Sequence, residues 1–149
     1  MTKSERLKPL VRMAESKEMT AARELGECMR VLNDKQARLD DLLKYRQEYA
    51  ERFQREGSVG MSARKMHDFR AFLANLDKGI EQQQGLVEQA AKILEEKRQQ
   101  WFSKRTRTKA LDNAVARYQS DEQRSEERRV QKESDERAIH DYGRNKKSE

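Results

Sequence analysis

The spacing of apolar residues constrains this chain more than any other feature. From residue 7 to residue 53, positions that are mostly apolar recur at alternating intervals of four and three. The fourteen positions are Leu7, Val11, Ala14, Glu18, Ala21, Leu25, Cys28, Leu32, Lys35, Leu39, Leu42, Arg46, Tyr49 and Phe53. Eleven of them are apolar, a heptad pattern typical of a coiled-coil seam rather than of a strand or loop. We therefore predict a first long helix over about residues 7–55.

A second run with the same spacing follows from residue 69 to residue 118. Its fifteen positions are Phe69, Leu73, Leu76, Ile80, Gln83, Val87, Ala90, Leu94, Lys97, Trp101, Lys104, Thr108, Leu111, Val115 and Tyr118, of which eleven are apolar. Between the two runs, Gly57 and Gly60 can end the first helix and Ser62 can cap the next. The pattern predicts a turn over 56–62 and a second helix from residue 63.

Two seams joined by a short turn predict an antiparallel hairpin. With the turn centred near residue 61, the numbers of two facing residues should add up to about 122. Phe53 then faces Phe69, and Glu18 lies opposite Lys104, where the two charges can neutralise each other. The expected fold class is all-α: a long antiparallel two-helix coiled-coil hairpin with an overhanging C-terminal helix.

The composition supports long solvated helices. Of 149 residues, 34% are hydrophobic and 40% are charged, which is too polar for a compact globule of this length. Disorder is disfavoured, because the chain has one proline and a net charge of only +6 from many charges of both signs.

The predicted start of the first helix near residue 7 sets the expected domain organisation, because residues of the second helix beyond the position that faces it have no partner. Residues 1–118 form the hairpin, and residues 119–149 have no partner within it. In this extension the apolar residues are few, and opposite charges three and four residues apart favour a solitary helix. We expect it to be helical and to fray near Tyr142 and Gly143.

Several kinds of chemistry are excluded by simple counts. The longest apolar run, residues 71–74, is far shorter than the roughly 20 residues of a membrane span, and the N-terminus lacks the apolar segment of a signal peptide. We expect a cytoplasmic protein with no direct membrane insertion. The single cysteine, Cys28, falls on the seam as a small buried residue, and His67 and His140 lie far from it in the sequence. We therefore expect no metal, no cofactor and no enzymatic activity.

The net charge is concentrated in residues 97–118, which carry seven basic residues and one acidic residue. A solvated helix face is one interpretation, and contact with an acidic surface is the other. The sequence has no nucleic-acid recognition motif, and Trp101 lies on the seam rather than on an exposed stacking surface, so we expect no nucleic-acid binding.

Near the turn, the chain has more apolar side chains than one seam can bury, since Leu43, Tyr45 and Phe72 occur out of phase with it. A wide seam packed by larger residues is one explanation. The alternative is a partner-binding face, which aromatic residues with polar tips favour.

Residues 42–49 read LLKYRQEY, residues 69–76 read FRAFLANL and residues 80–83 read IEQQ. These three segments resemble the FliJ family of flagellar export proteins. The resemblance extends over most of the chain, although Arg38, Gly79 and Gln83 occupy positions where the family pattern has other residue types.

The resemblance implies a non-enzymatic component of the flagellar type III export apparatus, similar to the hairpin of the rotary ATPase γ subunit. In the family, the end bearing the termini inserts into the ring of the export ATPase FliI. A surface nearer the turn binds the cytoplasmic domain of the gate protein FlhA, and members also handle export chaperones. Such a protein lies peripherally at the inner-membrane export apparatus. The runner-up is a stalk of a non-flagellar type III secretion system or a generic coiled-coil scaffold.

Two sets of candidate residues follow. By resemblance, the gate-binding face carries over to Leu42, Tyr45, Tyr49, Phe72 and Leu76. For the ATPase ring we hypothesise contacts from Lys97, Arg98, Lys104, Arg105, Arg107 and Lys109.

Overall fold

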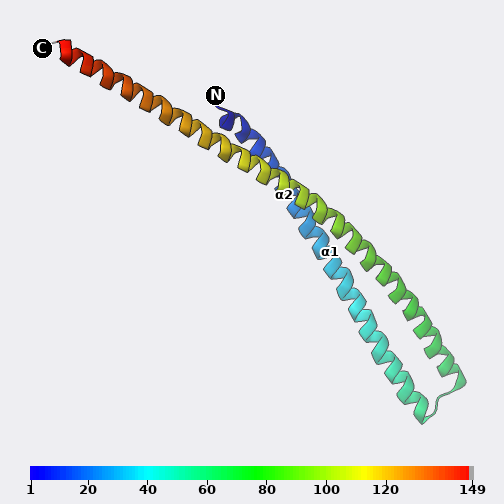
Figure 1. Cartoon of the computed structure of the whole chain (residues 1–149). Coiled ribbons are helices and arrows are strands. Elements are labelled where there is room, and N and C mark those ends of the chain that lie inside the picture. The colour runs from blue at the N-terminus through cyan, green and yellow to red at the C-terminus, as the bar shows by residue number, and fades with distance from the viewer. Residues whose placement is uncertain (148–149) are drawn as a thin grey trace. The chain divides into compact units, whose positions relative to one another are not determined.

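The computed structural model describes residues 1–147, and these form two helices. Helix α1 spans Lys3–Val59 and helix α2 spans Ala63–Lys147 (Figure 1). No strand occurs within the described range. The two long helices pack against each other as a helical hairpin, which confirms the predicted fold class.

Helix α1 begins at Lys3, four residues before the predicted start. The Thr2 hydroxyl accepts a hydrogen bond from the Glu5 amide at 3.3 Å, and the Thr2 amide donates to the Glu5 carboxylate at 3.0 Å. This reciprocal pair is a capping box, which satisfies backbone donors that a helix start leaves unpaired. The early start therefore has a local cause that lies outside the apolar seam.

The turn between the helices is shorter than predicted. Helix α1 continues to Val59, and Gly57 lies inside it, whereas Gly60 has a φ of 109°, in the region that glycine adopts most easily. Helix α2 begins at Ala63 as predicted. The Ser62 hydroxyl accepts a hydrogen bond from the Lys65 amide at 3.2 Å, which confirms Ser62 as the cap.

Helix α2 continues to Lys147, past Tyr142 and Gly143, and the expected fraying there stays a prediction. Pairs such as Glu126 with Arg129 join successive turns of this segment, and Arg129 also approaches Glu133. Such pairs support an otherwise unpartnered helix. Residues 148 and 149 lie outside the described range.

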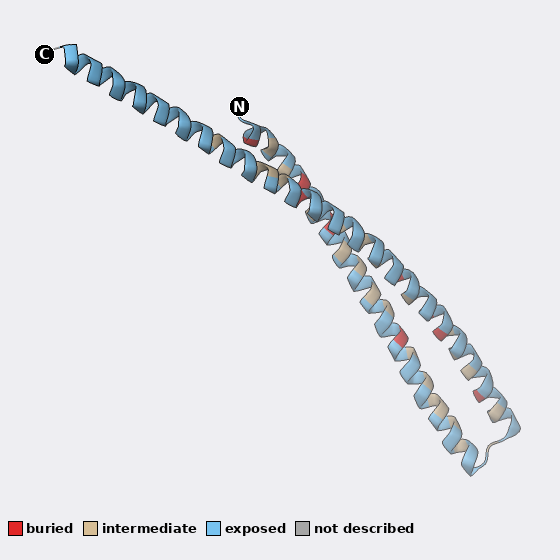
Figure 2. Ribbon diagram, viewed as in Figure 1, coloured by how far each residue is buried: buried red, intermediate tan, exposed pale blue. Residues whose placement is uncertain are grey.

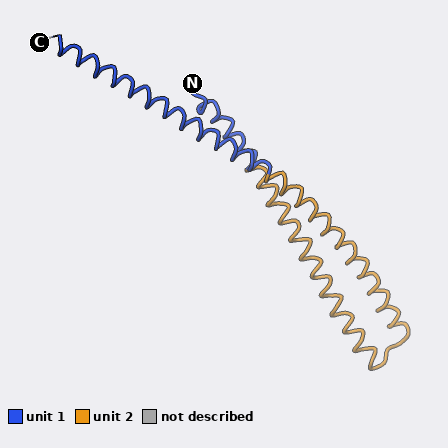
Figure 3. Tube along the Cα trace, in the orientation of Figure 1, with its two compact units in different colours: residues 1–18, 103–149 blue, residues 19–102 orange. Residues whose placement is uncertain are grey.

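The chain divides into two compact units, shown in different colours in Figure 3. Unit 1 consists of residues 1–18 and 103–149, and unit 2 consists of residues 19–102. Each unit contains a segment of both helices.

Unit 2 contains the turn, and its two segments are antiparallel in the predicted register. The Lys97 ammonium lies 3.3 Å from the Glu24 carboxylate, and the rings of Phe53 and Phe69 have centroids 5.2 Å apart. The numbers of each pair add up to 121 or 122, in agreement with the sequence. The core runs along the predicted seam, with Leu39, Phe69, Ile80 and Ala90 buried (Figure 2).

Unit 1 pairs the start of α1 with the second half of α2. Ala14 and Thr108 are buried, and the Thr108 hydroxyl donates to the Lys104 carbonyl at 3.0 Å, so this polar seam residue is satisfied within its own helix. The Lys3 ammonium lies 5.5 Å from the centre of the Tyr118 ring. Pairing thus reaches the predicted limit at Tyr118.

Pairing in unit 1 also extends past that limit, contrary to the expectation that residues beyond Tyr118 have no partner. The Glu122 carboxylate accepts hydrogen bonds from the Ser4 amide at 3.1 Å and from the Ser4 hydroxyl at 2.7 Å. Beyond Glu122, every residue as far as 147 is exposed (Figure 2).

The predicted pairing of Glu18 with Lys104 is wrong. Among the ion pairs within residues 1–147, none joins these two side chains. Glu18 is half-buried and Lys104 is exposed. A lysine at a seam position can turn its long side chain outward, which keeps the ammonium hydrated and removes the need for a partner.

Candidate partner-binding site

Five aromatic side chains form a continuous cluster in unit 2. The Tyr49 ring lies between Phe69 and Phe72, with centroid distances of 4.9 and 4.5 Å. Tyr45 meets Phe72 edge to face at 6.2 Å and lies 6.3 Å from Tyr49, and Phe53 extends the cluster from Phe69. These separations are those of favourable aromatic pairs. The structure therefore brings together three of the five residues expected to bind the gate.

The cluster has a buried side and an exposed side. Phe69 is 7% exposed, whereas Tyr45 is 49% exposed and Phe72 is 39% exposed. The remaining two predicted residues, Leu42 and Leu76, are half-buried on the seam. Tyr45 and Phe72 are thus the parts of this set that a partner can reach.

An ion pair across the helices lies beside the cluster. The Arg46 guanidinium donates two hydrogen bonds to the Asp77 carboxylate. The hydrogen bond from Arg46 holds the pKa of Asp77 below its ordinary value, and the opposite charge adds to this effect. Arg46 occupies a seam position, and its fork fixes the alignment of α1 against α2 close to the exposed rings.

The basic residues predicted to contact the ATPase differ in their surroundings. In unit 2, the Lys97 ammonium contacts Glu24, and the Arg98 guanidinium lies 3.6 Å from Glu95 on the same helix. The other four lie on α2 in unit 1 and are exposed: Lys104, Arg105, Arg107 and Lys109. Of the six predicted residues, these four therefore lie exposed in unit 1.

A family model decides the identity of the chain. The model described as flagellar FliJ protein matches residues 2–147. The chain belongs to the flagellar FliJ protein family. This match confirms the resemblance, and it covers residues of both units. No curated protein and no solved structure matches the chain.

FliJ membership makes the chain a component of the flagellar type III export system. Within residues 1–147, neither helix has a segment long and apolar enough to cross a membrane. In the same range, no three His, Cys, Asp or Glu side chains are grouped as metal ligands.

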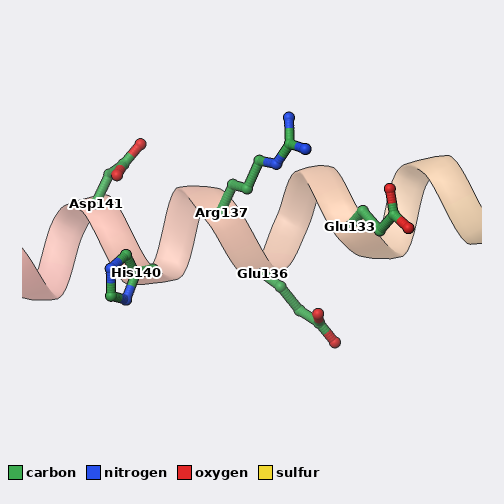
Figure 4. A pocket seen from close by; sticks show the side chains of 5 residues that line it. All are labelled: Glu133, Glu136, Arg137, His140 and Asp141. Atoms are coloured by element: carbon green, nitrogen blue, oxygen red, sulfur yellow. The ribbon is translucent and has the colours of Figure 1, made fainter.

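The last part of this FliJ-family chain carries a shallow depression, shown in Figure 4. Its lining residues are Glu133, Glu136, Arg137, His140 and Asp141, all from one stretch of α2. Arg137 and Asp141 point to one side of the helix, whereas Glu136 points to the other. Side chains that spread around a single helix do not converge on a ligand, so we assign no site to this depression.

Two contributors to the FliJ-family cluster were not predicted as site residues. Phe69 packs against Tyr49, the ring that contacts both exposed rings, and Asp77 binds Arg46 beside the cluster. Arg46 is a charged residue on the seam, and the predicted register places it opposite a position near 76. An acidic residue close to that position, Asp77, could therefore have been predicted as its partner. Phe69 was predicted only as a seam residue, because a buried ring that packs against another ring follows the same heptad spacing as any other core residue.

Proposed function

We propose that this chain is a non-enzymatic linker of the flagellar export apparatus, which connects the FliI ATPase ring to the export gate FlhA and escorts export chaperones. The single observation that supports this best is the family match over residues 2–147. In this proposal the protein acts in the cytoplasm, peripherally at the inner-membrane export apparatus, and binds neither nucleic acid nor a cofactor.

The aromatic cluster supports the contact with FlhA. Tyr45 and Phe72 present exposed rings on a pair of helices. The Tyr49 ring contacts both of them, and Phe69 in turn contacts Tyr49 from the buried side. Exposed aromatic side chains on a preorganised surface are the type of residue that carries binding energy at protein interfaces. We assign Leu42, Tyr49 and Leu76 to the support of this surface and Tyr45 and Phe72 to direct contact.

Exposed positive charge supports the contact with FliI. Lys104, Arg105, Arg107 and Lys109 lie within six residues on α2 and are suited to an acidic partner surface. Lys97 and Arg98 belong to unit 2, where they contact Glu24 and Glu95. The proposed escort of chaperones rests on the family alone.

The gate contact can be tested with Tyr45→Ala combined with Phe72→Ala. Because both rings are largely exposed, the variant should keep its helical circular dichroism signal while it loses pull-down of the FlhA cytoplasmic domain and swimming motility. Met19→Ala combined with Met29→Ala is the matched control, since both methionines are exposed in unit 2 away from the rings. Intact pull-down by the aromatic variant would remove the gate assignment.

A stalk of a non-flagellar type III secretion system has the same architecture and different partners. A generic coiled-coil scaffold would need no partner at either surface. The genes beside this one distinguish the three, because a flagellar operon that includes the export ATPase favours the flagellar role.

A further inference from the structure

A shallow apolar groove lies in unit 2, away from the aromatic cluster. It is lined by Cys28, Val31 and Lys35 from α1 and by Leu86, Gln89, Ala90 and Ile93 from α2. Val31 is 45% exposed, Leu86 is 42% exposed and Ile93 is 41% exposed. Three branched aliphatic side chains thus stay in contact with water on one face of the helix pair, where neither seam burial nor the gate contact uses them.

The two ends of the groove differ in charge. At one end lie Lys35 and, three residues further along α1, Arg38. At the other end lie Glu24, four residues before Cys28, and Glu96, three residues after Ile93. Residues three or four apart share a helix face, so these charges flank the apolar side chains.

Part of this charge has no partner inside the chain. Within residues 1–147, the side chains of Lys35, Arg38 and Glu96 form no ion pair, whereas Glu24 contacts Lys97. At the basic end, Lys35 and Arg38 are therefore uncompensated. At the acidic end, Glu96 is uncompensated within the described residues, whereas Glu24 and Glu27 pair with Lys97 and Arg30.

We propose that a second copy of this chain binds in the groove and forms a symmetric dimer of unit 2. A two-fold axis that crosses the helices at right angles near Val31 places α1 antiparallel to its copy. Lys35 and Arg38 then face the acidic end of the second copy, where Glu24 and Glu27 exchange Lys97 and Arg30 of their own chain for these two charges. Exposed ion pairs of this kind contribute little, so the exchange costs little. The same contacts recur on the other side of the axis. The aliphatic side chains of both copies meet at the centre.

Charge complementarity selects this arrangement over the other symmetric one. A two-fold axis parallel to the helices would place the same ends of the two grooves side by side. Lys35 and Arg38 of one chain would then lie at the same end as Lys35 and Arg38 of the other chain. Like charges in that position repel each other. The apolar contact is small, so the dimer is weak, depends on protein concentration and loses affinity as salt increases.

Sedimentation of the full chain tests the apolar centre. The apparent mass should rise above the monomer value of 17.6 kDa as concentration increases, and Val31→Glu should abolish the rise. Met29→Glu is the matched control, because Met29 is 47% exposed on the opposite side of α1. A mass of 17.6 kDa at all concentrations, or a rise that Val31→Glu leaves unchanged, would overturn the proposal.

A charge exchange tests the orientation. One variant carries Lys35→Glu and Arg38→Glu, and the other carries Glu24→Lys and Glu27→Lys. Each variant alone places like charges opposite each other and should stay monomeric, whereas an equimolar mixture restores both sets of contacts and should dimerise. If the mixture sediments as the two separate variants do, this antiparallel arrangement is wrong.

Disulfide trapping locates the axis independently of affinity. In a Cys28→Ser background, Val31→Cys should give a crosslinked dimer under mild oxidation by copper phenanthroline, while Met29→Cys should not. Equal crosslinking at both positions would indicate random collision and contradict the proposed interface. The measurement needs neither FlhA nor FliI, so its failure would leave the proposed export function untouched.

Discussion

The Glu122 carboxylate accepts hydrogen bonds from both the backbone amide and the hydroxyl of Ser4. Glu122 and Ser4 lie 118 positions apart in the sequence. Ser4 is only 4% exposed, so this polar contact takes the place of an apolar pair at that point of unit 1. It holds the first turn of α1 against α2 after the apolar residues have ended.

This contact predicts a pH-dependent N-terminus. The hydroxyl and amide of Ser4 stabilise the charged carboxylate and lower the pKa of Glu122 below 4.5. A lowered pKa means that the contact stabilises the fold fully above pH 4.5 and that this stability is lost as pH falls through the folded-state pKa. In a pH titration by NMR, the Ser4 amide signal should shift with a midpoint below 4.5.

Glu122→Gln is the control for that titration. The amide keeps the shape of the side chain but does not titrate, so the Ser4 signal should become insensitive to acid. If the midpoint of the Ser4 shift persists in this variant, another group is responsible. A midpoint above 4.5 in the unsubstituted chain would contradict a lowered pKa for Glu122.

A second prediction concerns Gln83, the buried polar residue in the seam of unit 2. Its side-chain amide donates to the Lys35 carbonyl at 2.9 Å. A net hydrogen bond contributes about 1 kcal/mol, whereas burial of a leucine contributes about 1.5–3 kcal/mol. Gln83→Leu should therefore raise the midpoint of urea unfolding, while Gln83→Ala should lower it. A lower midpoint for the leucine variant would show that the hydrogen bond outweighs apolar burial at this position.

The turn provides a matched pair of glycine substitutions. Gly60 has a φ of 109°, so Gly60→Ala should destabilise the fold by roughly 1–2 kcal/mol because an alanine disfavours that conformation. Gly57 lies inside α1 with open space where the methyl group of an alanine would lie, so Gly57→Ala should stabilise the helix by up to about 1 kcal/mol. Thermal unfolding monitored by circular dichroism should move in opposite directions for the two variants. Equal shifts would mean that the backbone at Gly60 relaxes freely.

The sequence predicted the seam well because burial in a coiled coil follows spacing alone. All fourteen positions assigned to α1 are buried or half-buried, and the pair Phe53 and Phe69 meets as expected. The helix start was missed because it depends on the capping box of Thr2 and Glu5, which apolar spacing does not register. Those two residues, three apart, were the signal that could have shown it.

Polar contacts between the helices were less predictable. The register pairs Lys104 with Glu18, yet the lysine side chain is exposed, because long charged side chains can turn to water at little cost. Ser4 and Glu122 meet without belonging to either apolar run. At the aromatic cluster, the spacing identified Tyr45 and Phe72 as out of phase, but only the structure shows that Tyr49 contacts both rings and is itself backed by Phe69.

The last prediction tests the basic surface of unit 1 against the ATPase. Combined change of Lys104, Arg105 and Arg107 to Glu reverses three exposed charges on α2. If this surface meets acidic loops of FliI, attraction becomes repulsion, and stimulation of ATP hydrolysis by purified FliI should fall. The remaining stimulation should also depend less on salt, because fewer opposite charges are screened.

The control is a triple reversal of the same charge elsewhere on α2. Arg124→Glu, Arg128→Glu and Lys132→Glu change the net charge equally in the exposed segment beyond Glu122. If stimulation depends only on the overall charge, both triple variants lose it to the same extent. If it depends on the surface at 104–107, only the first variant loses it. An unchanged rate in the first variant would remove these residues from the proposed ATPase contact, while the proposed gate contact at Tyr45 and Phe72 would depend on its own test.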